Sequence, residues 1–524
     1  MTGSPLEDRR TLWIVGAVTL LLFLIADLPW QLDDYDQAKQ AFTSFEIIKE
    51  GHWFYQRTPH EHVATKPPLV GWISAALFAL TRSWEVAWRL PSFLAAVAIA
   101  ILLFRAGHSM DGHGANRLAP GGGEDEDEGS SSYATIAGLI ALSAFGLNLL
   151  SPRLATLVRT DMPLALVIFL IGLLIWQKIQ RQEEWKPRDR IYIFALLTAA
   201  MLIKGPIVYA FLLPGIALFQ WRTGRVGALR RPDAAARRPY LQSRVNPWFG
   251  WWPWIASLGV FLLWVIGGIL FQPGFYNEVV IREFIGRFGE TIHRPQPLYF
   301  YLPHLLHKFA PWSVLMIALA AFDLASRRWR IGVAFREMSP ATFWLLCWSL
   351  GGLMVMSLIP SKRVDRIFPV IPPLCLLLAA QIGNIFRHEQ LRTRVYRWSA
   401  VAVILSILIT GGYTVAKVIF GYRDHRDALV VFGREVRHEA EVHQWRYEVV
   451  SPKDEGLLLY LQRTHFIKPD CAVAEWNGGN LDALVAPTEE ASALMRKLHD
   501  AALSQLKSNE RREGQGRGYV LITR

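Results

Sequence analysis

The sequence predicts an all-α polytopic membrane protein of about 11 to 13 transmembrane helices, with interfacial helices and a small α/β domain at the C-terminus. The first observation behind this prediction is a series of long apolar runs, such as LPSFLAAVAIAILLF and MPLALVIFLIGLLIW. They are as long as a bilayer core requires and contain almost no charge, which would cost several kcal/mol there. In addition, basic residues crowd the loops between the runs, and the runs stop before residue 423.

Eleven runs are predicted to span the membrane. The first is taken as uncleaved, because no small-residue cleavage site follows it and the chain continues with DLPWQLDD. The stretch PPLVGWISAALFALT is also apolar, but a crossing there would invert every later loop. We therefore expect it to lie along the outer interface, or to enter and return. The predicted spans lie near residues 11–29, 89–106, 134–150, 161–177, 191–203, 206–221, 252–271, 298–321, 341–359, 369–386 and 399–420.

The formal charge of +12 is explained by membrane topology rather than by nucleic-acid binding. Lysines and arginines crowd four short loops between predicted spans, which begin near Lys178, Arg222, Arg327 and Arg387. Basic short loops are the usual signal of the cytoplasmic side. With a cytoplasmic N-terminus, all four loops fall on that side. The odd number of spans then places the C-terminal domain outside.

The chain divides into a transmembrane domain at 1–422 and a soluble domain at 423–524. Within the first, 30–88 forms a long outer loop with interfacial helices, and 107–133, which contains GGGEDEDEGSSS, is typical of a flexible cytoplasmic linker. In the soluble domain, YEVVSP and CAVAEW predict strands, LLLYLQRT and ASALMRKLHDAALSQLK predict helices, and GYVLITR ends the pattern. This alternation predicts a small α/β domain.

Four outer segments carry charged side chains that this topology brings to one side. They are the loop that begins DDYDQAKQ, then SPRLATLVRTDMP, NEVVIREFIGRFGETIHRPQPLYFYLP and IPSKRVDRIFPVIPP, and Lys204 stands at the outer end of a span. Basic residues on the outer side oppose the positive-inside trend, so they need a reason. A bound anion at membrane depth would supply one. The alternative is that they pair with local carboxylates and lipid head groups.

These segments, in this order, resemble the GT-C class of polytopic glycosyltransferases that use polyprenyl-phosphate sugars. Within that class they are similar to the bacterial branch of lipid A aminoarabinose transferases and protein mannosyltransferase-like proteins. That family has an acidic pair after the first span, then a tryptophan, then a Lys-Pro at an interfacial helix. Asp36, Trp53 and Lys66 match these positions. The likeness continues through RLPS, RTDMPLAL, LIKGP, GRFGETIHRPQPLYFYLP and SKRVDRIFPVIPP, and covers roughly residues 10–420.

Three positions depart from the family pattern. The family's second acid is Gln37 here, the residue before the lysine is Thr65 where the aminoarabinose branch has Glu, and a tyrosine near the lipid phosphate is replaced by Arg366. These departures place the aminoarabinose donor in doubt. They leave a lipid phosphate as the leaving group.

The resemblance implies an enzyme of the bacterial inner membrane whose C-terminal domain is periplasmic. It would move a hexose or pentose from an outward-facing undecaprenyl-phosphate donor to a lipid or protein hydroxyl, without a nucleotide sugar. Such a transfer needs a base for the acceptor hydroxyl, cations for the departing phosphate and a groove for the apolar tail. Nucleic acid has no part in it.

We predict Asp36 as the base of an inverting displacement, and the resemblance supports this choice. Asp34 is the alternative, since DYD also reads as a motif that could hold a divalent ion; no other cofactor is expected. Asp161 would orient the Asp36 loop or the acceptor, although an ordinary pair with Arg159 fits almost as well. Lys39, one helical turn from Asp36, could hold that carboxylate ionised.

Five residues are candidates for binding the lipid phosphate. Fixed cations in a low dielectric stabilise an anionic leaving group far better than they would in water. His293 could instead be a satisfied interfacial histidine, and Arg366 could pair locally or anchor to lipid. The candidates are Lys66, Arg287, His293, Lys362 and Arg366.

A transporter or flippase for an anionic lipid is the alternative function. That class favours ionisable residues in the middle of spans and broken helices. Here the charges stand at span ends and in outer loops, which favours the transferase. The three cysteines, Cys347, Cys375 and Cys471, suggest neither a disulfide framework nor a zinc site.

Overall fold

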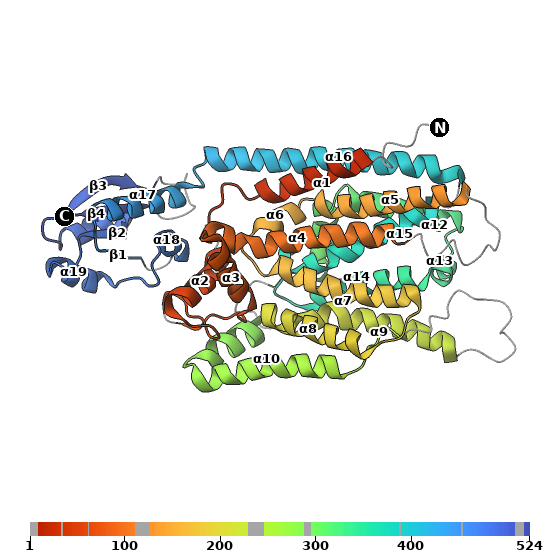
Figure 1. The fold of residues 1–524 in the computed structure, drawn as a ribbon, viewed down its shortest axis with the longest axis horizontal. Helices are drawn as coiled ribbons and strands as arrows, with labels where there is room; N and C mark the ends of the chain where they lie inside the picture. The colour runs from red at the N-terminus through yellow and green to blue at the C-terminus, as the bar shows by residue number, and fades with distance from the viewer. Residues whose placement is uncertain are drawn as a thin grey trace.

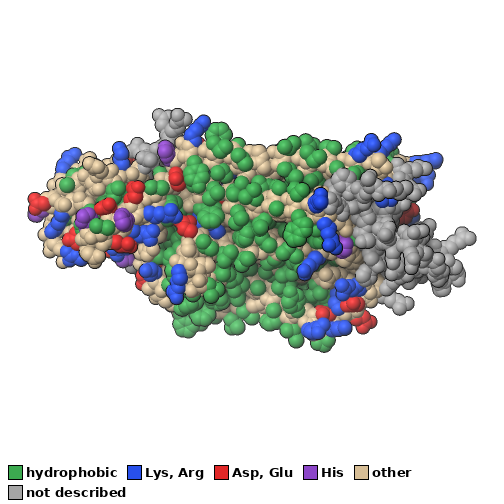
Figure 2. All heavy atoms as spheres, turned by 45° about the horizontal axis from the view of Figure 1, so that its top comes forward, with side chains coloured by type: hydrophobic (Ala, Val, Ile, Leu, Met, Phe, Trp, Pro, Cys, Tyr) green, Lys and Arg blue, Asp and Glu red, His purple; other side chains and the backbone are tan. Residues whose placement is uncertain are grey.

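The computed structural model describes residues 9–32, 35–60, 62–110, 125–228, 246–287, 295–386, 389–451, 454–508 and 518–524. Its long helices run side by side along the length of the molecule, and a small sheet lies at one end (Figure 1). Apolar side chains form a broad belt around the middle, whereas charged side chains gather toward the two ends (Figure 2). This distribution is that of a protein whose middle lies in lipid.

The helical part is formed by one bundle with short helices at its ends. Brief 3-10 or π-helical turns occur at η2 (Tyr276–Phe284), η3 (Ile285–Arg287), η4 (Leu298–Phe300) and η5 (Val364–Val370). The α-helices are α1 (Arg9–Ile25), α2 (Tyr35–Glu50), α3 (Leu69–Thr81), α4 (Trp84–His108), α5 (Asp125–Gly146), α6 (Ser151–Thr156), α7 (Asp161–Arg181), α8 (Pro187–Lys204), α9 (Ile207–Ala228), α10 (Trp252–Phe271), α11 (Tyr301–Lys308), α12 (Trp312–Ser326), α13 (Ile331–Glu337), α14 (Pro340–Leu358), α15 (Ile371–Phe386) and α16 (Glu389–Arg423).

The predicted fold class is confirmed, and every predicted span coincides with a helix or a helix pair. Within the described residues, six helices are long and apolar enough to cross a membrane by themselves. A seventh crossing is possible where α11 and α12 form a pair bent by 101° over the span predicted at 298–321. Shorter apolar helices, among them α3, complete the bundle.

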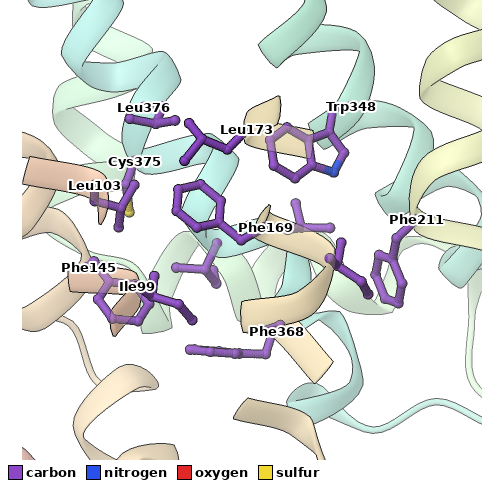
Figure 3. Close-up of a cluster of buried hydrophobic side chains, with 14 of the residues drawn as sticks. Ile99, Leu103, Phe145, Phe169, Leu173, Phe211, Trp348, Phe368, Cys375 and Leu376 are labelled. Atoms are coloured by element: carbon purple, nitrogen blue, oxygen red, sulfur yellow. The ribbon is translucent and has the colours of Figure 1, made fainter. Parts of the chain in front are cut away.

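Burial separates the central helices from those at the periphery. In the apolar window of α7, 78% of the residues are buried, whereas in α10 the share is 28% although its hydropathy is as high. Figure 3 shows the packing around α7, where the ring centroids of Phe169 and Trp348 are 6.0 Å apart. A helix that is apolar all round but little buried faces lipid. α10 is therefore a peripheral helix and α7 a central one.

The C-terminal domain is a four-stranded sheet of order β1-β2-β4-β3 with short helices around it. β1 pairs with β2 in parallel, and β4 is antiparallel to both β2 and β3. β2 and β4 are buried almost throughout, as expected for central strands. The elements are α17 (Ala428–Val442), β1 (Tyr447–Val449), α18 (Glu455–Tyr460), α19 (Pro469–Asn477), β2 (Ala483–Pro487), α20 (Thr488–Met495), β3 (Ala502–Lys507) and β4 (Tyr519–Thr523).

Three local predictions are corrected. CAVAEW, predicted as a strand, lies in α19, because Pro469 begins a helix there and Ala472 and Trp476, four residues apart, form its buried face. The helix predicted over 491–507 ends at Met495, and its second half forms the edge strand β3. The predicted linker at 107–133 is also too long, since α4 continues to His108 and α5 begins at Asp125.

Candidate active site

Asp36 lies in the first turn of α2, at the centre of a cluster of charged side chains. An acid in the first turn suits the partial positive charge of a helix start. The Asp36 carboxylate forms a hydrogen-bonded ion pair with Arg363. Nη2 of Arg159 lies 3.8 Å from the same carboxylate oxygen, Oδ2. Two arginines that are remote in sequence therefore converge on one carboxylate, whose side chain remains 32% exposed.

Arg159 links Asp36 to a second carboxylate, that of Asp365. Nη1 of Arg159 donates to Oδ2 of Asp365 at 2.7 Å, and the arginine side chain is only 6% exposed. The backbone that carries it is fixed to α4, because Oγ of Ser92 donates to the carbonyl oxygens of Leu157 at 2.8 Å and Arg159 at 3.3 Å. A buried arginine is tolerated when carboxylates compensate its charge, and this one has two.

Asp161 and Lys204 form the second ion pair of the cluster. Asp161 is the first residue of α7, and Lys204 is the last residue of α8, which packs against α7. An acid at a helix start and a base at a helix end also interact favourably with the helix dipoles. Arg159, the alternative partner of Asp161 from the sequence, instead donates to Asp365.

Lys66 lies between the two ion pairs. Burial, which has the largest effect, and the neighbouring Lys204 lower the pKa of Lys66 to about 8, although Asp36 and Asp161 favour its charged form. The residue follows Thr65, which is buried, and precedes Pro67 and Pro68 at the start of α3. Two prolines restrict the backbone that carries the ammonium group. Lys66 is thus a fixed cation that is still mostly charged at neutral pH.

The cations of the cluster keep Asp36 ionised. Burial would raise the pKa of Asp36, but Lys66 first, then Arg363 and Arg159, outweigh it and lower the pKa to about 2. A carboxylate with this pKa is fully charged at neutral pH and is a weak base while the cations have no other anion to bind. An anion bound to these cations would reverse part of the shift.

Lys39 stands one turn along α2 from Asp36, as predicted. Its Nζ lies 3.5 Å from Oγ1 of Thr65 and 5.9 Å from the centroid of the Tyr35 ring. Burial lowers the pKa of Lys39, and Arg282 acts in the same direction. Lys39 therefore connects α2 to the segment that precedes Lys66.

The two candidates of the KRVDR segment face different partners. Arg366 donates from Nη1 to the carbonyl oxygen of Ser361 at 2.6 Å and to its Oγ at 3.1 Å. Lys362 donates from Nζ to the carbonyl oxygen of Gln296 at 2.8 Å and is 6% exposed. Lys362 thus ties the segment to Gln296, whereas Arg366 stabilises the segment internally.

Three predicted site residues lie wholly or partly outside the residues that the structure describes. Asp34 and His293 are outside the described residues, and so is the side chain of Arg287, whose backbone ends η3. The predicted metal site at Asp34 and Asp36 therefore stays a prediction. Among the residues that are described, no group of three or more His, Cys, Asp or Glu side chains could hold a metal ion.

The roles of Arg363 and Lys204 in the cluster were not predicted from the sequence. Both stand in quoted motifs, KRVDR and LIKGP, so their presence in outer segments was visible. The sequence could not tell which of the neighbouring Lys362, Arg363 and Arg366 reaches Asp36, because the 3-10 turn of η5 sends successive side chains in different directions. Gln37 likewise has a structural partner, since its Oε1 accepts a hydrogen bond from the Val158 amide at 3.2 Å.

The cluster as a whole carries an excess of positive charge. Around Asp36 and Asp161 the described residues supply six cations and three carboxylates, a formal surplus of three charges while Lys66 is protonated. Arg282, Glu278 and Glu455 add one cation and two carboxylates around Lys39, which leaves a surplus of two. A surplus of this kind in a partly buried site stabilises an anion and destabilises the site without one. The cations are Lys39, Lys66, Arg159, Lys204, Arg363 and Arg366, and the carboxylates are Asp36, Asp161 and Asp365.

No family model matches the chain. Curated relatives do: the undecaprenyl phosphate-alpha-4-amino-4-deoxy-L-arabinose arabinosyl transferase of Shewanella sediminis is 24% identical over 389 residues, which are 73% of this chain and 62% of the relative. The corresponding transferase of Pectobacterium carotovorum is 35% identical over 150 residues, 28% of this chain and 25% of the relative. The chain thus spans less than two thirds of the length of these relatives.

The fold matches a solved structure over nearly its whole length. ArnT from Cupriavidus metallidurans, in the crystal structure bound to undecaprenyl phosphate, has a TM-score of 0.65 at 17% identity, with 97% of each chain covered. Its apo structure gives 0.64 with 98% of each chain covered. The chain is thus similar in sequence to the undecaprenyl phosphate-aminoarabinose arabinosyl transferases, and it shares the polytopic fold of ArnT.

Proposed function

We propose that the chain is a glycosyltransferase of the bacterial inner membrane. It transfers a sugar from an undecaprenyl-phosphate donor to a hydroxyl group of a lipid or protein on the periplasmic face. The observation that carries the proposal is the convergence of Lys66, Arg363 and Lys204 around Asp36 and Asp161, from segments spread over much of the chain. The names of the relatives support the donor class.

The phosphate of the donor supplies the anion that the surplus of cations requires. The departing undecaprenyl phosphate is a phosphate monoester with one or two negative charges. Fixed cations stabilise the charge that develops on it in the transition state. Arg363 can bind two oxygens through its planar guanidinium group, and Lys66 acts as a point charge. Since Arg363 is paired with Asp36 without the substrate, phosphate binding would loosen this pair.

Asp36 is then the base. Once the leaving phosphate neutralises Lys66 and Arg363, the two influences that hold the pKa of Asp36 at about 2 weaken, and its basicity rises. The carboxylate would take the proton of the acceptor hydroxyl as the oxygen attacks the anomeric carbon and the phosphate departs from the opposite face. A single displacement of this kind inverts the anomeric centre. Asp161 keeps Lys204 and Lys66 in place.

The residues around Asp36 also bear on which sugar the undecaprenyl-phosphate donor carries. The relatives are named for 4-amino-4-deoxy-L-arabinose, but Gln37 and Thr65 stand where the family pattern has acids. Here Gln37 binds the Val158 amide and Thr65 lies beside Lys39. A site with fewer carboxylates is less suited to an amino sugar, which favours a neutral hexose or pentose.

The test is transfer by purified protein in lipid nanodiscs. Undecaprenyl-phosphate aminoarabinose, mannose and glucose are offered in turn, with lipid A and with membrane protein as acceptors. We expect transfer with at least one donor, and its loss in Asp36→Asn at unchanged expression. The matched control is Asp470→Asn, an exposed acid on α19. Full activity of Asp36→Asn, or no transfer with any donor, would contradict the proposal.

One observation favours the second candidate, a transporter of an anionic lipid. The bent pair of α11 and α12 is a broken helix of the kind that transporters use. The described charges of the cluster nevertheless lie at helix ends and in connecting segments. Reconstituted protein that moved fluorescent undecaprenyl phosphate across vesicles without transferring sugar would support the transporter and contradict the transferase.

A further inference from the structure

α18 of the C-terminal domain packs on α2 and on the backbone that leads into it (Figure 1). Oη of Tyr460, the last residue of α18, accepts a hydrogen bond from the amide of Leu32 at 2.7 Å, and both residues are buried. At Gly456, on the same helix, a Cβ atom would lie 2.5 Å from the carbonyl oxygen of Leu32, so a larger residue would force the two segments apart. Both polar backbone groups of Leu32 therefore lie against α18.

The C-terminal domain also shares a hydrophobic core with two segments of the candidate site. Ala38 of α2 and Val158 belong to the same buried cluster as Leu458 of α18. Ala38 follows Asp36 by two positions, and Val158 immediately precedes Arg159. Nη2 of Arg159 lies 3.8 Å from Oδ2 of Asp36. Both partners of this contact are thus carried by backbone that packs on the C-terminal domain.

Two further contacts reach the rest of the outer loop. At the end of α2, Oγ1 of Thr464 donates to Oε1 of Glu50 at 2.7 Å. The ring of Phe466 stacks on that of His60, in the segment that leads to Lys66, with the ring centroids 5.5 Å apart. The domain therefore contacts the outer loop before α2, along it and beyond it, which is more than a flexibly tethered module would do.

We propose that Tyr460 is a positioning residue of the active site, whose hydroxyl fixes the Leu32 backbone at the entry to α2 and thereby holds Asp36 in place opposite Arg363. The partners of Asp36 come from other segments, so their distances from it depend on where α2 begins. A base must lie within hydrogen-bonding reach of the proton that it takes, and a small misplacement lowers the rate. The proposal rests on the proposed function, because it assigns Tyr460 to that site.

The experiment uses the full-length protein in nanodiscs, with whichever undecaprenyl-phosphate sugar the wild-type protein transfers. Tyr460→Phe keeps the ring and removes the acceptor of the Leu32 amide. We expect kcat to fall about tenfold, as a small misplacement of the base would cause. The affinity for undecaprenyl phosphate, measured by fluorescence titration, should stay unchanged, because Lys66 and Arg363 remain.

Gly456→Ala tests the same backbone from its carbonyl side. Its added Cβ atom pushes on the Leu32 carbonyl oxygen, so it should lower kcat and spare the affinity as Tyr460→Phe does. The double variant should lose less than the product of the two single losses, since both changes displace one peptide segment. Losses that multiply fully would show that the two residues do not act through Leu32, and would contradict the proposal.

Tyr447→Phe is the matched control. Oη of Tyr447 donates to the carbonyl oxygen of Leu461 at 2.7 Å, so this buried hydroxyl is bonded within the C-terminal domain and not to the outer loop. Its removal should lower the melting temperature and leave kcat unchanged. A wild-type kcat in Tyr460→Phe would overturn the proposal. An equal fall of kcat in Tyr447→Phe would also overturn it, and so would a fall of kcat in Tyr460→Phe matched by a loss of undecaprenyl-phosphate binding.

Hydrogen exchange followed by mass spectrometry gives a measurement that needs no substrate. The amides around Leu32 and in the first turn of α2 should exchange faster in Tyr460→Phe than in the wild type, and at the wild-type rate in Tyr447→Phe. Unchanged exchange in Tyr460→Phe would overturn the proposal whatever the transfer rate.

Asp36→Asn, measured alongside, separates this proposal from the proposed function. Full activity of Asp36→Asn would contradict the proposed function itself. An inactive Asp36→Asn together with a fully active Tyr460→Phe would remove only the role of Tyr460.

Discussion

At the scale of the residue, the candidate site is a balance between a few carboxylates and a larger number of cations. Asp36 has a low pKa because Lys66 and Arg363 surround it, and Lys66 has a low pKa because it is buried beside Lys204. Neighbouring positive charge contributes to both shifts, although burial is the largest cause of the low pKa of Lys66. An anion that enters the site would relieve both shifts, so the titration of these residues should report substrate binding.

Lys66 predicts the pH dependence of donor binding. Its pKa of about 8 means that the ammonium form predominates below pH 8 and is lost above it. Above the second pKa of the ligand's phosphate, which is about 6, the affinity for undecaprenyl phosphate should therefore weaken as the pH rises through about 8. Fluorescence titration in nanodiscs at a series of pH values measures this. Lys66→Met should bind weakly at every pH, and a Lys66→Met profile that still falls at pH 8 would assign the titration to another group.

Arg363→Met should affect both the rate and the acid side of the pH profile. Loss of a group that stabilises the departing phosphate should lower kcat about a hundred- to a thousandfold. Because Arg363 also lowers the pKa of Asp36, its removal should raise that pKa from about 2. The acid limb of kcat/KM, which reports the free enzyme, should then move to higher pH. Arg363→Lys keeps the charge and should show a smaller shift; an unmoved limb in Arg363→Met would separate Arg363 from Asp36.

At the scale of the element, close helix packing keeps the ends of the helices in register, and the site is built at those ends. Asp161 begins α7, Lys204 ends α8, and Arg363 and Asp365 precede α15. Where helices in a membrane approach closely, small residues form the interface, because no hydrophobic effect drives the contact in lipid. α9 and α14 show this at Gly215 and Gly351.

Gly351→Ala should destabilise the protein through this contact. The added Cβ atom would lie 2.5 Å from the amide nitrogen of Gly215, and backbone cannot move aside as a flexible side chain can. We expect a loss of about 1–3 kcal/mol, typical of overpacking, seen as a lower melting temperature in detergent. Gly412→Ala is the control, since its Cβ would meet nothing within 4 Å in α16. Equal melting temperatures for the two variants would contradict the packing argument.

At the scale of the whole molecule, charge and apolar surface divide the protein into a lipid-facing middle and two polar ends (Figure 2). α1 begins near one end, and the C-terminal domain lies at the other, on the side of α2 (Figure 1). The candidate site is at the junction between the bundle and this domain. A lipid donor in the membrane and an acceptor outside it could both reach such a place.

Cysteine labelling tests on which side of the membrane the C-terminal domain lies. Cys471 on α19 is exposed, whereas Cys347 and Cys375 are buried in the bundle. A membrane-impermeant maleimide should therefore label Cys471 in intact spheroplasts if the C-terminal domain is periplasmic. The double variant Ser326→Cys/Cys471→Ser moves the thiol to the end of α12, on the predicted cytoplasmic side. It should be labelled only after permeabilisation, and the reverse pattern would invert the topology.

Much of the site was visible in the sequence as outer segments with unexplained cations, and Asp36, Lys66, Asp161 and Lys39 are close together as predicted. The ion-pair partners within the site were not visible in the sequence. Arg363 rather than Lys362 reaches Asp36, and Lys204 rather than Arg159 pairs with Asp161. Neighbouring residues in a turn have almost the same sequence context, so only the path of the backbone decides which side chain faces the site.

Hydrophobicity by itself predicted where the helices of the bundle lie, because a helix that crosses lipid must be long and apolar and its own sequence shows both properties. Tertiary structure alone decided that the C-terminal domain docks on α2, where Oη of Tyr460 accepts a hydrogen bond from the Leu32 amide. No local pattern encodes a contact between residues more than four hundred positions apart. Such contacts depend on the shape of two folded surfaces, which exists only after each has formed.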